Sequence, residues 1–348
     1  MFTMVRRRGD CATPQPLRAY AAFREKFLGR RYRSYRNRSA CADRAQTAAL
    51  ADEFADLPMS SVVSTSDAVV AIDFGASNTD VVFQHHDETR RWTLRSHGQP
   101  DESRVREVLA VGAVQPSDVA WIAVTGGNRE RLPSSIDQRP LVVVPEVQAI
   151  GRGGLALAGL EQALVASAGS GNAVVTATPN GAKHVTGSGV GGGTLVGLGR
   201  LLLGITDPRE LDALALKGSA KGLNLTIGEI VGGAIGTLPP NTTAVNFGRA
   251  AREPVDASPE DTAAALVNMV GQVIAVIAIN AARAEQMAHI VVVGHLTDLA
   301  SIRETFRLVG QFYGTTLQVP PHGGFATATG ALLEARAMQL RVATASSS

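Results

Sequence analysis

The sequence predicts an α/β protein made of two similar lobes, each with a mixed sheet covered by helices. Strand-like apolar runs alternate with helical patterns along most of the 348 residues. Each half opens with a strand, a short glycine-containing turn and a second strand, AIDFGASNTDVVF and then LVASAGSGNAVVT. At 45% hydrophobic residues the chain can bury a large core, so we expect an N-terminal lobe at residues 66–160 and a C-terminal lobe at residues 161–340.

Residues 1–58 differ from the rest in composition. The first 44 residues hold 11 arginines and one lysine against three acidic residues, a formal charge of +9, which leaves −7 for residues 45–348. An Arg-rich start is typical of a transit peptide or a nucleic-acid-binding arm. Because apolar periodicity is missing until just after Met59, we instead predict a disordered tail or a misassigned start, with no nucleic-acid partner.

The cysteines and the longest apolar run indicate the cellular compartment of the protein. Cys11 and Cys41 both lie in this tail, so the body has no disulfide framework and no thiolate metal site, which fits a reducing cytoplasm. The longest apolar run, residues 263–282, is interrupted by three polar amide side chains. We therefore expect a buried core helix there and no membrane partner.

Periodicity and turn residues place the elements of the first half. The apolar runs AVVAID and DVVFQ predict strands at 68–73 and 80–84, joined by a glycine bend. Further apolar runs of strand length, 119–125 and 141–144, alternate with helical patterns at 101–114 and from about residue 146.

The second half repeats this order. Strands are expected near 163–167, 172–178, 183–186, 290–294 and 316–319. Helices are expected at 194–203, 208–217, 260–287 and 298–310, and from about residue 326. Strands that alternate with helices in this way imply mixed sheets covered on both faces.

Asp73 is the candidate carboxylate for organising a metal ion. It ends an apolar strand immediately before Gly75 and beside Ser77, Asn78 and Thr79. Phosphoryl transfer needs backbone donors around the phosphates and a carboxylate that positions the metal, and this turn offers both. The alternative is an aspartate that only caps the turn.

Two glycine-rich segments of the second half are candidates for holding phosphate. The turn GSGN at 169–172 offers the Ser170 and Asn172 side chains, and GSGVGGGT at 187–194 has five glycines in eight positions. Glycine costs a regular element about 0.5–1 kcal/mol relative to alanine, so a closely packed ligand or backbone is expected there rather than a plain turn. The helix that follows would point free N–H groups at an anion.

Glu146 and His184 are the remaining candidates. Glu146 follows the strand LVVVP and starts a helix, where the helix dipole stabilises an acidic side chain. Alternatively, Glu146 is a general base for a substrate hydroxyl. His184, next to Lys183, either adds positive charge near a cleft or belongs to an ordinary surface pair. The sequence has no HExxH motif and no Cys/His cluster, so a zinc site is not predicted.

Several ordered motifs across residues 68–335 together resemble a known family. These are AIDFGASNTD, VPEVQAIGRG, AGSGNAVV, HVTGSGVGGGTLVGLGRLLLG, NLTIGEIVGG, LPPNTTAVNFG, VVVGH and HGGFATATGALL. They resemble the type II (eukaryotic-like, or fumble) pantothenate kinases, members of the actin, hexokinase and Hsp70 superfamily. The resemblance implies two ribonuclease H-like lobes around a nucleotide cleft.

The resemblance also implies an activity and roles for single residues. The family phosphorylates pantothenate with ATP and Mg²⁺ in the first step of coenzyme A synthesis and works as a homodimer. By this resemblance, Glu146 is the general base, Asp73 positions Mg²⁺ directly or through water, and His184 meets the substrate. The residues implied in nucleotide binding are Gly75, Ala76, Ser77, Asn78, Thr79, Ser170, Gly192, Gly193, Thr194, Leu195, Val196 and Ala326.

Three positions depart from the family pattern. Asp80 stands where the first loop usually carries a lysine, His184 where an arginine meets the acid end of pantothenate, and His295 where an asparagine follows the late strand. Asp80 should weaken ATP binding unless Lys183 or another base compensates at the phosphates, and His184 should supply only part of an arginine's charge. Two further functions stay open: a non-catalytic homologue that binds coenzyme A or acyl-CoA, and a kinase for another small hydroxy acid or sugar.

Overall fold

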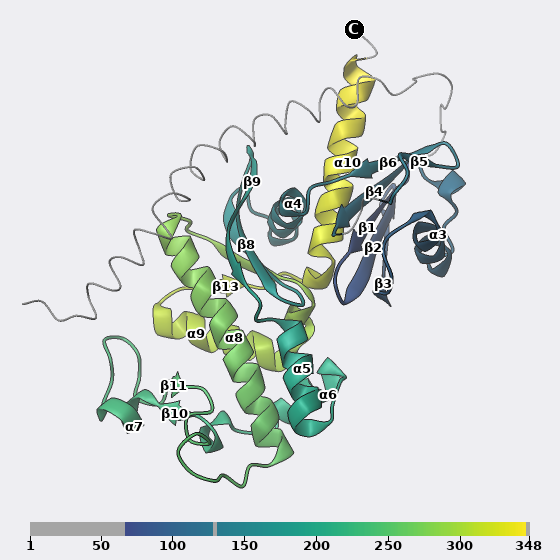
Figure 1. Cartoon of the computed structure of the whole chain (residues 1–348). Helices are drawn as coiled ribbons and strands as arrows, with labels where there is room; N and C mark the ends of the chain where they lie inside the picture. Colours follow the sequence, from purple (N-terminus) through teal and green to yellow (C-terminus); the bar gives the residue numbers. More distant parts are fainter. Residues whose placement is uncertain (1–66, 128–130, 346–348) are drawn as a thin grey trace, which may run out of the picture. The chain divides into compact units, whose positions relative to one another are not determined.

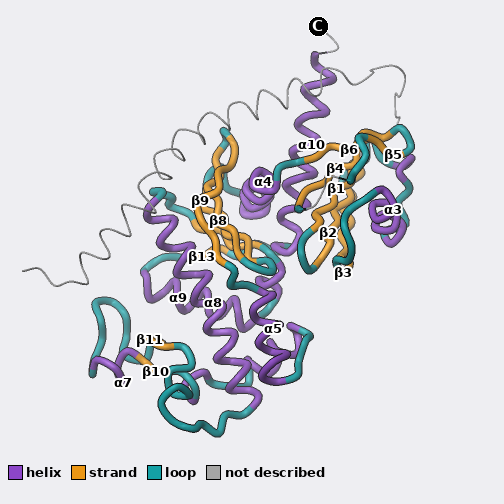
Figure 2. The backbone as a smooth tube through the Cα atoms, in the orientation of Figure 1, coloured by secondary structure: helices purple, strands orange, loops and turns teal. Residues whose placement is uncertain are grey.

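The computed structural model describes residues 67–127 and 131–345 (Figure 1). The tail predicted at residues 1–58, with both cysteines, lies outside the described residues. Most strands collect in two separate groups, each with helices beside it (Figure 2). The predicted α/β class with two mixed sheets is confirmed, whereas the lobe boundaries themselves stay a prediction.

The first sheet is built from the first half of the chain, in the order β3-β2-β1-β4-β6-β5. Its first three strands form an antiparallel meander, and β4 and β6 run parallel to β1. One face buries apolar side chains under helix α3 (Glu102–Val111), whose N-cap Asp101 accepts a hydrogen bond from the Arg104 amide at 2.9 Å. The strands are β1 (Val69–Phe74), β2 (Asn78–His85), β3 (Glu88–Arg95), β4 (Trp121–Gly126), β5 (Ser135–Ile136) and β6 (Arg139–Val143).

The second sheet repeats the plan of the first. Its order is β13-β12-β7-β8-β9, so an antiparallel three-strand meander is again followed by two parallel strands. Both meanders therefore leave their first hairpin turn, residues 75–77 or 169–171, at the carboxyl end of the leading strand. The strands are β7 (Ala163–Ala168), β8 (Asn172–Thr178), β9 (Gly181–Ser188), β12 (Ile290–Val293) and β13 (Leu317–Gln318).

Two helices cross between the sheets, α4 (Glu146–Ala158) and α10 (Ala326–Ala345). Helix α10 packs alanine and leucine side chains on β1 and β4 of the first sheet, whereas α4 packs on the second sheet. The helices touch through glycines: a Cβ on Gly153 would lie 1.8 Å from the Ala326 carbonyl oxygen, and one on Gly330 would lie 1.9 Å from the Ala149 carbonyl oxygen. Only glycine allows this close crossing.

The core of the second half centres on α8 (Pro259–Ala284), which packs against α5 (Gly192–Leu203), α6 (Pro208–Ala215) and α9 (Ala300–Tyr313). By length and composition α8 is apolar enough to cross a membrane, but 61% of its most apolar window is buried inside the protein. The core helix expected around residues 263–282 is therefore what the structure contains.

Strand β3 (Glu88–Arg95) and the elements of the segment 224–248 were not predicted from the sequence. β3 has the sequence ETRRWTLR, whose charged residues are not typical of a strand. In the structure Trp92 packs beneath α3, and its Nε1 donates to the Val108 carbonyl at 3.0 Å. The segment 224–248 forms a small two-stranded sheet around one short helix. Its elements are β10 (Leu225–Thr226), α7 (Ile227–Val231) and β11 (Thr243–Val245).

Candidate active site

A cleft of about 760 Å³ lies between the carboxyl ends of the two sheets. Both hairpin turns line it, the first with Ser77 and the second with Ser170, and their hydroxyl oxygens are 2.6 Å apart. The start of α5, the end of β12 and the start of α10 complete the wall. The cleft therefore joins the same structural position of two repeated units, which explains why both turns carry small polar residues.

The first turn is held by close main-chain contacts. A Cβ on Gly75 would lie 2.8 Å from the Asn78 carbonyl oxygen, so the bend requires glycine. Ser96 donates from its hydroxyl to the Gly75 carbonyl at 2.7 Å, which ties the turn to the end of β3. The turn is thus fixed before any ligand binds.

The glycine-rich segment of the second half packs mainly on backbone. A Cβ on Gly191 would lie 2.6 Å from the Gly171 carbonyl oxygen, and one on Gly187 would lie 2.5 Å from that of Asn172. The Gly192 and Gly193 amides donate to the Gly169 and Ser170 carbonyls at 2.8 and 2.9 Å. The expectation of close packing is right, but these two amides are occupied by the neighbouring turn and are not free for phosphate.

A chain of charged groups crosses the cleft from one sheet to the other. Asp80 on β2 is buried, accepts a hydrogen bond from Thr93 at 2.6 Å and lies 2.8 Å from Nε2 of His295. Nδ1 of His295 lies 2.8 Å from Asp298. Since a carboxylate can only accept, both ring nitrogens must donate, and the ring is an imidazolium. Burial lowers the pKa of His295, but the hydrogen bonds to Asp298 and Asp80 outweigh it and raise the pKa to about 10.

Asp73 lies beside this chain, and its pKa is raised to about 8. Burial is the largest cause, and the nearby charges of Asp80 and Glu146 act in the same direction. His295 and a hydrogen bond from Thr327 oppose the shift. Asp73 therefore keeps its proton near neutral pH, and a cation bound beside it would favour the ionised form.

We predict that Asp80 and His295 act as one unit. Asp80→Asn and His295→Asn should each destabilise the protein, and the double variant should show a coupling energy of about 1.5–3 kcal/mol, as for hydrogen bonds between charged groups. Because the His295 pKa is raised, its contribution should be complete below pH 6.5 and be lost as the pH rises towards 10. Urea unfolding of all four proteins at pH 7 and pH 10 measures both effects. Additive single effects at pH 7 would mean that the pair is not coupled.

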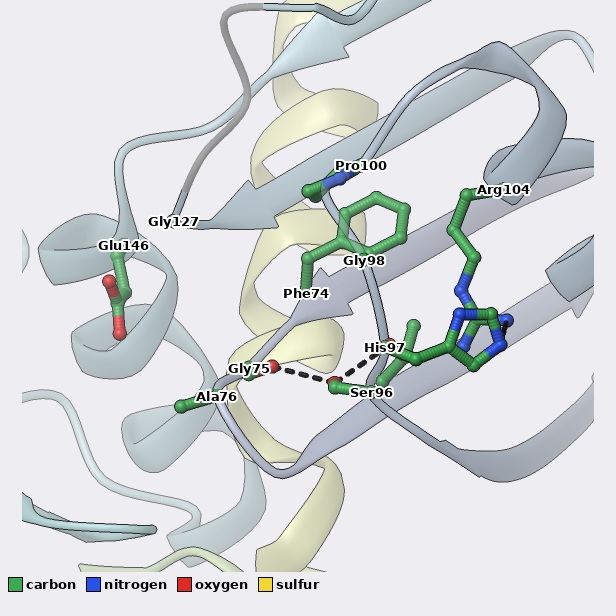
Figure 3. A pocket seen from close by; sticks show the side chains of 11 residues that line it. Phe74, Gly75, Ala76, Ser96, His97, Gly98, Pro100, Arg104, Gly127 and Glu146 are labelled. Carbon is green, nitrogen blue, oxygen red and sulfur yellow. Dashed lines mark hydrogen bonds between the residues drawn. The ribbon is translucent and has the colours of Figure 1, made fainter.

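Glu146 stands where the cleft meets a second cavity of about 530 Å³ (Figure 3). It is the first residue of α4, its side chain is exposed, and it lines both cavities together with Gly75 and Ala76. Figure 3 shows Glu146 on one side of the smaller cavity and His97 with Arg104 on the other. A base at this junction can reach a hydroxyl that approaches the larger cleft.

The structure brings most of the predicted site residues together. Those that line the cleft are Asp73, Gly75, Ala76, Ser77, Asn78, Glu146, Ser170, Gly192, Gly193 and Val196. Thr79 is buried and lines the smaller cavity instead. Leu195 and Ala326 are fully buried in the core, and Thr194 binds the main chain of Gly189 and Gly191.

His184 and Lys183 are not among the residues that line either cavity. His184 lies on the edge strand β9, opposite Val175, and is exposed. The arginines that do line the cleft are Arg95 and Arg200, which the sequence analysis missed. Arg95 pairs with Asn78 in the sheet, and Arg200 follows Gly192 and Val196 at helical spacing, so the missed signal was periodicity.

The residues of the cleft fit a nucleotide and a divalent cation. Asp73, Asp80 and Glu146 bring three carboxyl groups to the cleft, and burial, followed by the charges of the other two, raises the Asp73 pKa. Oxygen ligands of this kind suit Mg²⁺. The hydroxyls of Ser77 and Ser170, with the two arginines, provide donors and positive charge for phosphate oxygens.

The fold is shared with solved structures of low sequence identity. The activator of the 2-hydroxyisocaproyl-CoA dehydratase from Clostridium difficile with bound ADPNP has a TM-score of 0.54 at 16% identity, covering 79% of this chain and 97% of that one. A ROK family glucokinase from Streptomyces griseus in complex with glucose and AMPPNP has a TM-score of 0.50 at 14% identity, covering 76% and 98%. The chain thus has the actin- and hexokinase-like fold.

Sequence comparison is more specific. Residues 163–334 match the Fumble family model. A type II pantothenate kinase of one Bacillus cereus strain is 25% identical over 282 residues, covering 77% of this chain and 98% of that protein. One from Oceanobacillus iheyensis is 27% identical over 271 residues, covering 76% and 98%. Another, from a second Bacillus cereus strain, is 33% identical over 150 residues, covering 43% and 55%. The chain is a homologue of the type II pantothenate kinases.

Proposed function

We propose that this protein is an ATP-dependent small-molecule kinase that phosphorylates pantothenate to 4′-phosphopantothenate, the first step of coenzyme A synthesis. The position of Glu146 at the junction of the two cavities carries this proposal, because a base is needed where an acceptor hydroxyl meets the phosphate donor. The substrate class rests on the relatives, two of which are covered almost completely by the match.

In the proposed reaction Glu146 accepts the proton of the substrate hydroxyl. The hydroxyl oxygen bonds to the γ-phosphorus, and the bond between the γ-phosphorus and the β,γ-bridging oxygen breaks, which releases ADP. Ser77, Asn78 and Ser170 hold phosphate oxygens, and Arg95 and Arg200 offset their charge. Asp73 would hold Mg²⁺, directly or through water, and the ion would neutralise charge on the β- and γ-phosphates. This assignment makes Asp73 ionised when the cleft is occupied.

The test is turnover of the purified full-length protein with ATP and pantothenate. We expect pantothenate-dependent ADP release, with one 4′-phosphopantothenate detected by mass spectrometry for each ADP. A panel of other hydroxy acids and sugars runs in parallel. If ADP release does not depend on pantothenate but depends on another compound of the panel, the protein is a kinase with that compound as its substrate.

A non-catalytic homologue that binds coenzyme A or acyl-CoA is the second candidate. Asp80 favours it, because by the family resemblance this acid stands where a lysine is usual, so a cation that would face the phosphates is missing from this part of the cleft. Thermal-shift measurements with ATP, pantothenate and acetyl-CoA separate the two functions. A sensor would respond to acetyl-CoA without turnover, whereas a kinase under feedback control would show both.

We also propose a cytoplasmic homodimer. The described surface exposes large apolar side chains on α5 and around α7. Monomeric proteins rarely expose groups of such side chains. These residues are Leu201, Leu202, Ile230, Val231 and Ile235. Light scattering coupled to gel filtration measures the mass, and Leu201→Asp with Ile230→Asp should shift a dimer to a monomer.

A further inference from the structure

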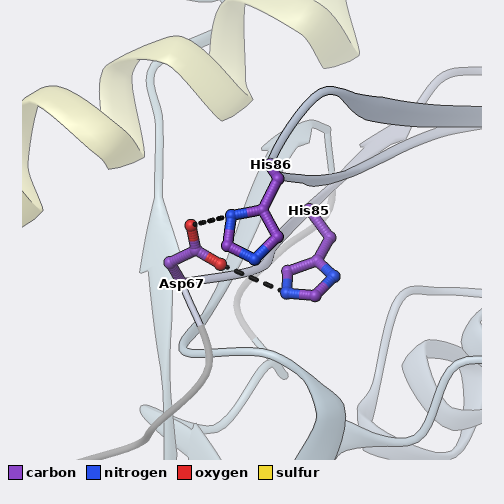
Figure 4. A group of neighbouring side chains, drawn as sticks. All are labelled: Asp67, His85 and His86. Atoms are coloured by element: carbon purple, nitrogen blue, oxygen red, sulfur yellow. Dashed lines mark ion pairs between the residues drawn. The ribbon is translucent and has the colours of Figure 1, made fainter.

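Two histidines and one aspartate meet at the end of the first sheet that is remote from the cleft (Figure 4). Asp67 directs its two carboxylate oxygens at two different rings: Oδ1 lies 3.3 Å from His85 Nε2, and Oδ2 lies 3.0 Å from His86 Nδ1. The two ring centroids are 4.2 Å apart, and the three donor atoms all lie within 4.8 Å of one another. We propose that Asp67, His85 and His86 bind a divalent transition-metal ion, with Zn²⁺ as the ion that suits them best.

The distances support coordination of a single ion. In a tetrahedral zinc site with bonds of about 2.0–2.1 Å, neighbouring ligand atoms lie about 3.3 Å apart. Each ring nitrogen already lies at about this distance from one oxygen of Asp67, 3.3 Å for His85 and 3.0 Å for His86, and one donor atom from each residue lies within 4.8 Å of the other two. Two imidazoles and one carboxylate form a donor set that suits zinc better than magnesium or calcium. The ion would replace the ring protons that now point at Asp67.

The main chain holds the three ligands in place. β1 and β2 pair with Val69 opposite Gln84, which brings Asp67, two residues before β1, to the end of β2 and the turn that follows it. The Ala120 amide donates to the Ala68 carbonyl at 2.8 Å, and Arg336 of α10 donates to the Asp67 carbonyl at 3.5 Å. His86 has a left-handed backbone with φ of 51°, which turns its ring back towards Asp67. The ligands are therefore arranged before the ion arrives.

The site is open and separate from the phosphate cleft. The side chains of Asp67, His85 and His86 are 51%, 43% and 71% exposed, so a water molecule would complete the coordination. The six residues of β1, roughly 20 Å at the usual rise per residue, separate it from the first phosphate turn. The ion would therefore stabilise the edge of the sheet rather than take part in phosphoryl transfer.

Calorimetric titration of the full-length protein with Zn²⁺, and absorption spectra with Co²⁺, test the proposal. We expect one ion per chain and a rise in the unfolding temperature. His85→Ala, His86→Ala and Asp67→Asn should each weaken binding at least about tenfold. His289→Ala and Asp87→Asn, an exposed histidine and an exposed acid outside the cluster, serve as matched controls and should bind like the parent protein.

Two results would overturn the proposal. One is unchanged Zn²⁺ affinity in the His85→Ala/His86→Ala double variant, which circular dichroism would show to be folded. The other is loss of binding in a Cys11→Ser/Cys41→Ser variant that keeps both histidines, because the ion would then be held by thiolates. Turnover in the absence of Zn²⁺ should be the same for His86→Ala and the parent protein.

Discussion

Replacing Glu146 with glutamine is expected to lower kcat for pantothenate phosphorylation by about 10²- to 10⁴-fold, the usual contribution of general-base catalysis. Glutamine has nearly the same shape but cannot accept the hydroxyl proton. Glu146 has no part in the hydrogen bonds that hold either phosphate turn, so KM for ATP should stay within about twofold. A steady-state assay that varies ATP and pantothenate separately measures both quantities.

The matched control is Glu161→Gln, which changes an exposed glutamate on the loop before β7. It should leave kcat unchanged. The stability of the Glu146→Gln protein should differ little from that of the parent protein, because an acid in the first turn of a helix contributes about 0.3–1 kcal/mol. A Glu146→Gln protein with full turnover would show that another group, or none, removes the proton.

Replacing Gly330 with alanine is expected to destabilise the protein by about 3 kcal/mol or more, at the upper end of overpacking effects. The added methyl carbon would lie 1.9 Å from the Ala149 carbonyl oxygen and 2.7 Å from the Gly153 amide nitrogen. Both are backbone atoms, so no side-chain rotation can relieve the clash, and α4 and α10 must move apart. Gly153→Ala should act in the same way, because its methyl carbon would meet the Ala326 carbonyl.

Gly197→Ala is the matched control for the helix crossing. Gly197 also lies within a helix, but a Cβ there meets nothing within 4 Å. Alanine should therefore stabilise the protein by about 0.5–1 kcal/mol through helix propensity. Urea unfolding followed by circular dichroism gives the free energies. If Gly330→Ala unfolded like the parent protein, the crossing would not be as close as the structure has it.

Local patterns in the sequence were enough to predict most of the fold. Strands β1, β2, β7 and β8 are apolar runs of strand length, and glycine marks the turns between them. β3 could not be found in this way, because its arginines and glutamate look like a loop. It forms a strand because the hairpin pairs it with β2 and because Trp92 packs beneath α3.

The candidate site was predictable only in part. Asp73 lies near the carboxyl end of β1, and Glu146 and Ser170 follow β6 and β7, so their places at carboxyl ends of strands in the two repeated halves predict that they meet. The role of Gly192 and Gly193 could not be predicted, because the carbonyl groups that occupy their amides come from another turn. The contact between Asp80 and His295 joins residues 215 positions apart, and no periodicity reports such a pair.

The glycine crossing of α4 and α10 has a consequence for motion. Glu146 opens α4, and Thr327, which bonds to Asp73, lies in the first turn of α10. Between Gly153 and Gly330 the helices meet main chain to main chain, with no compressible side chains between them. The two halves of the protein can therefore rotate about this contact but cannot approach one another there. Any relative motion of the two helices would therefore pivot at this contact, and it would move Glu146 relative to Asp73.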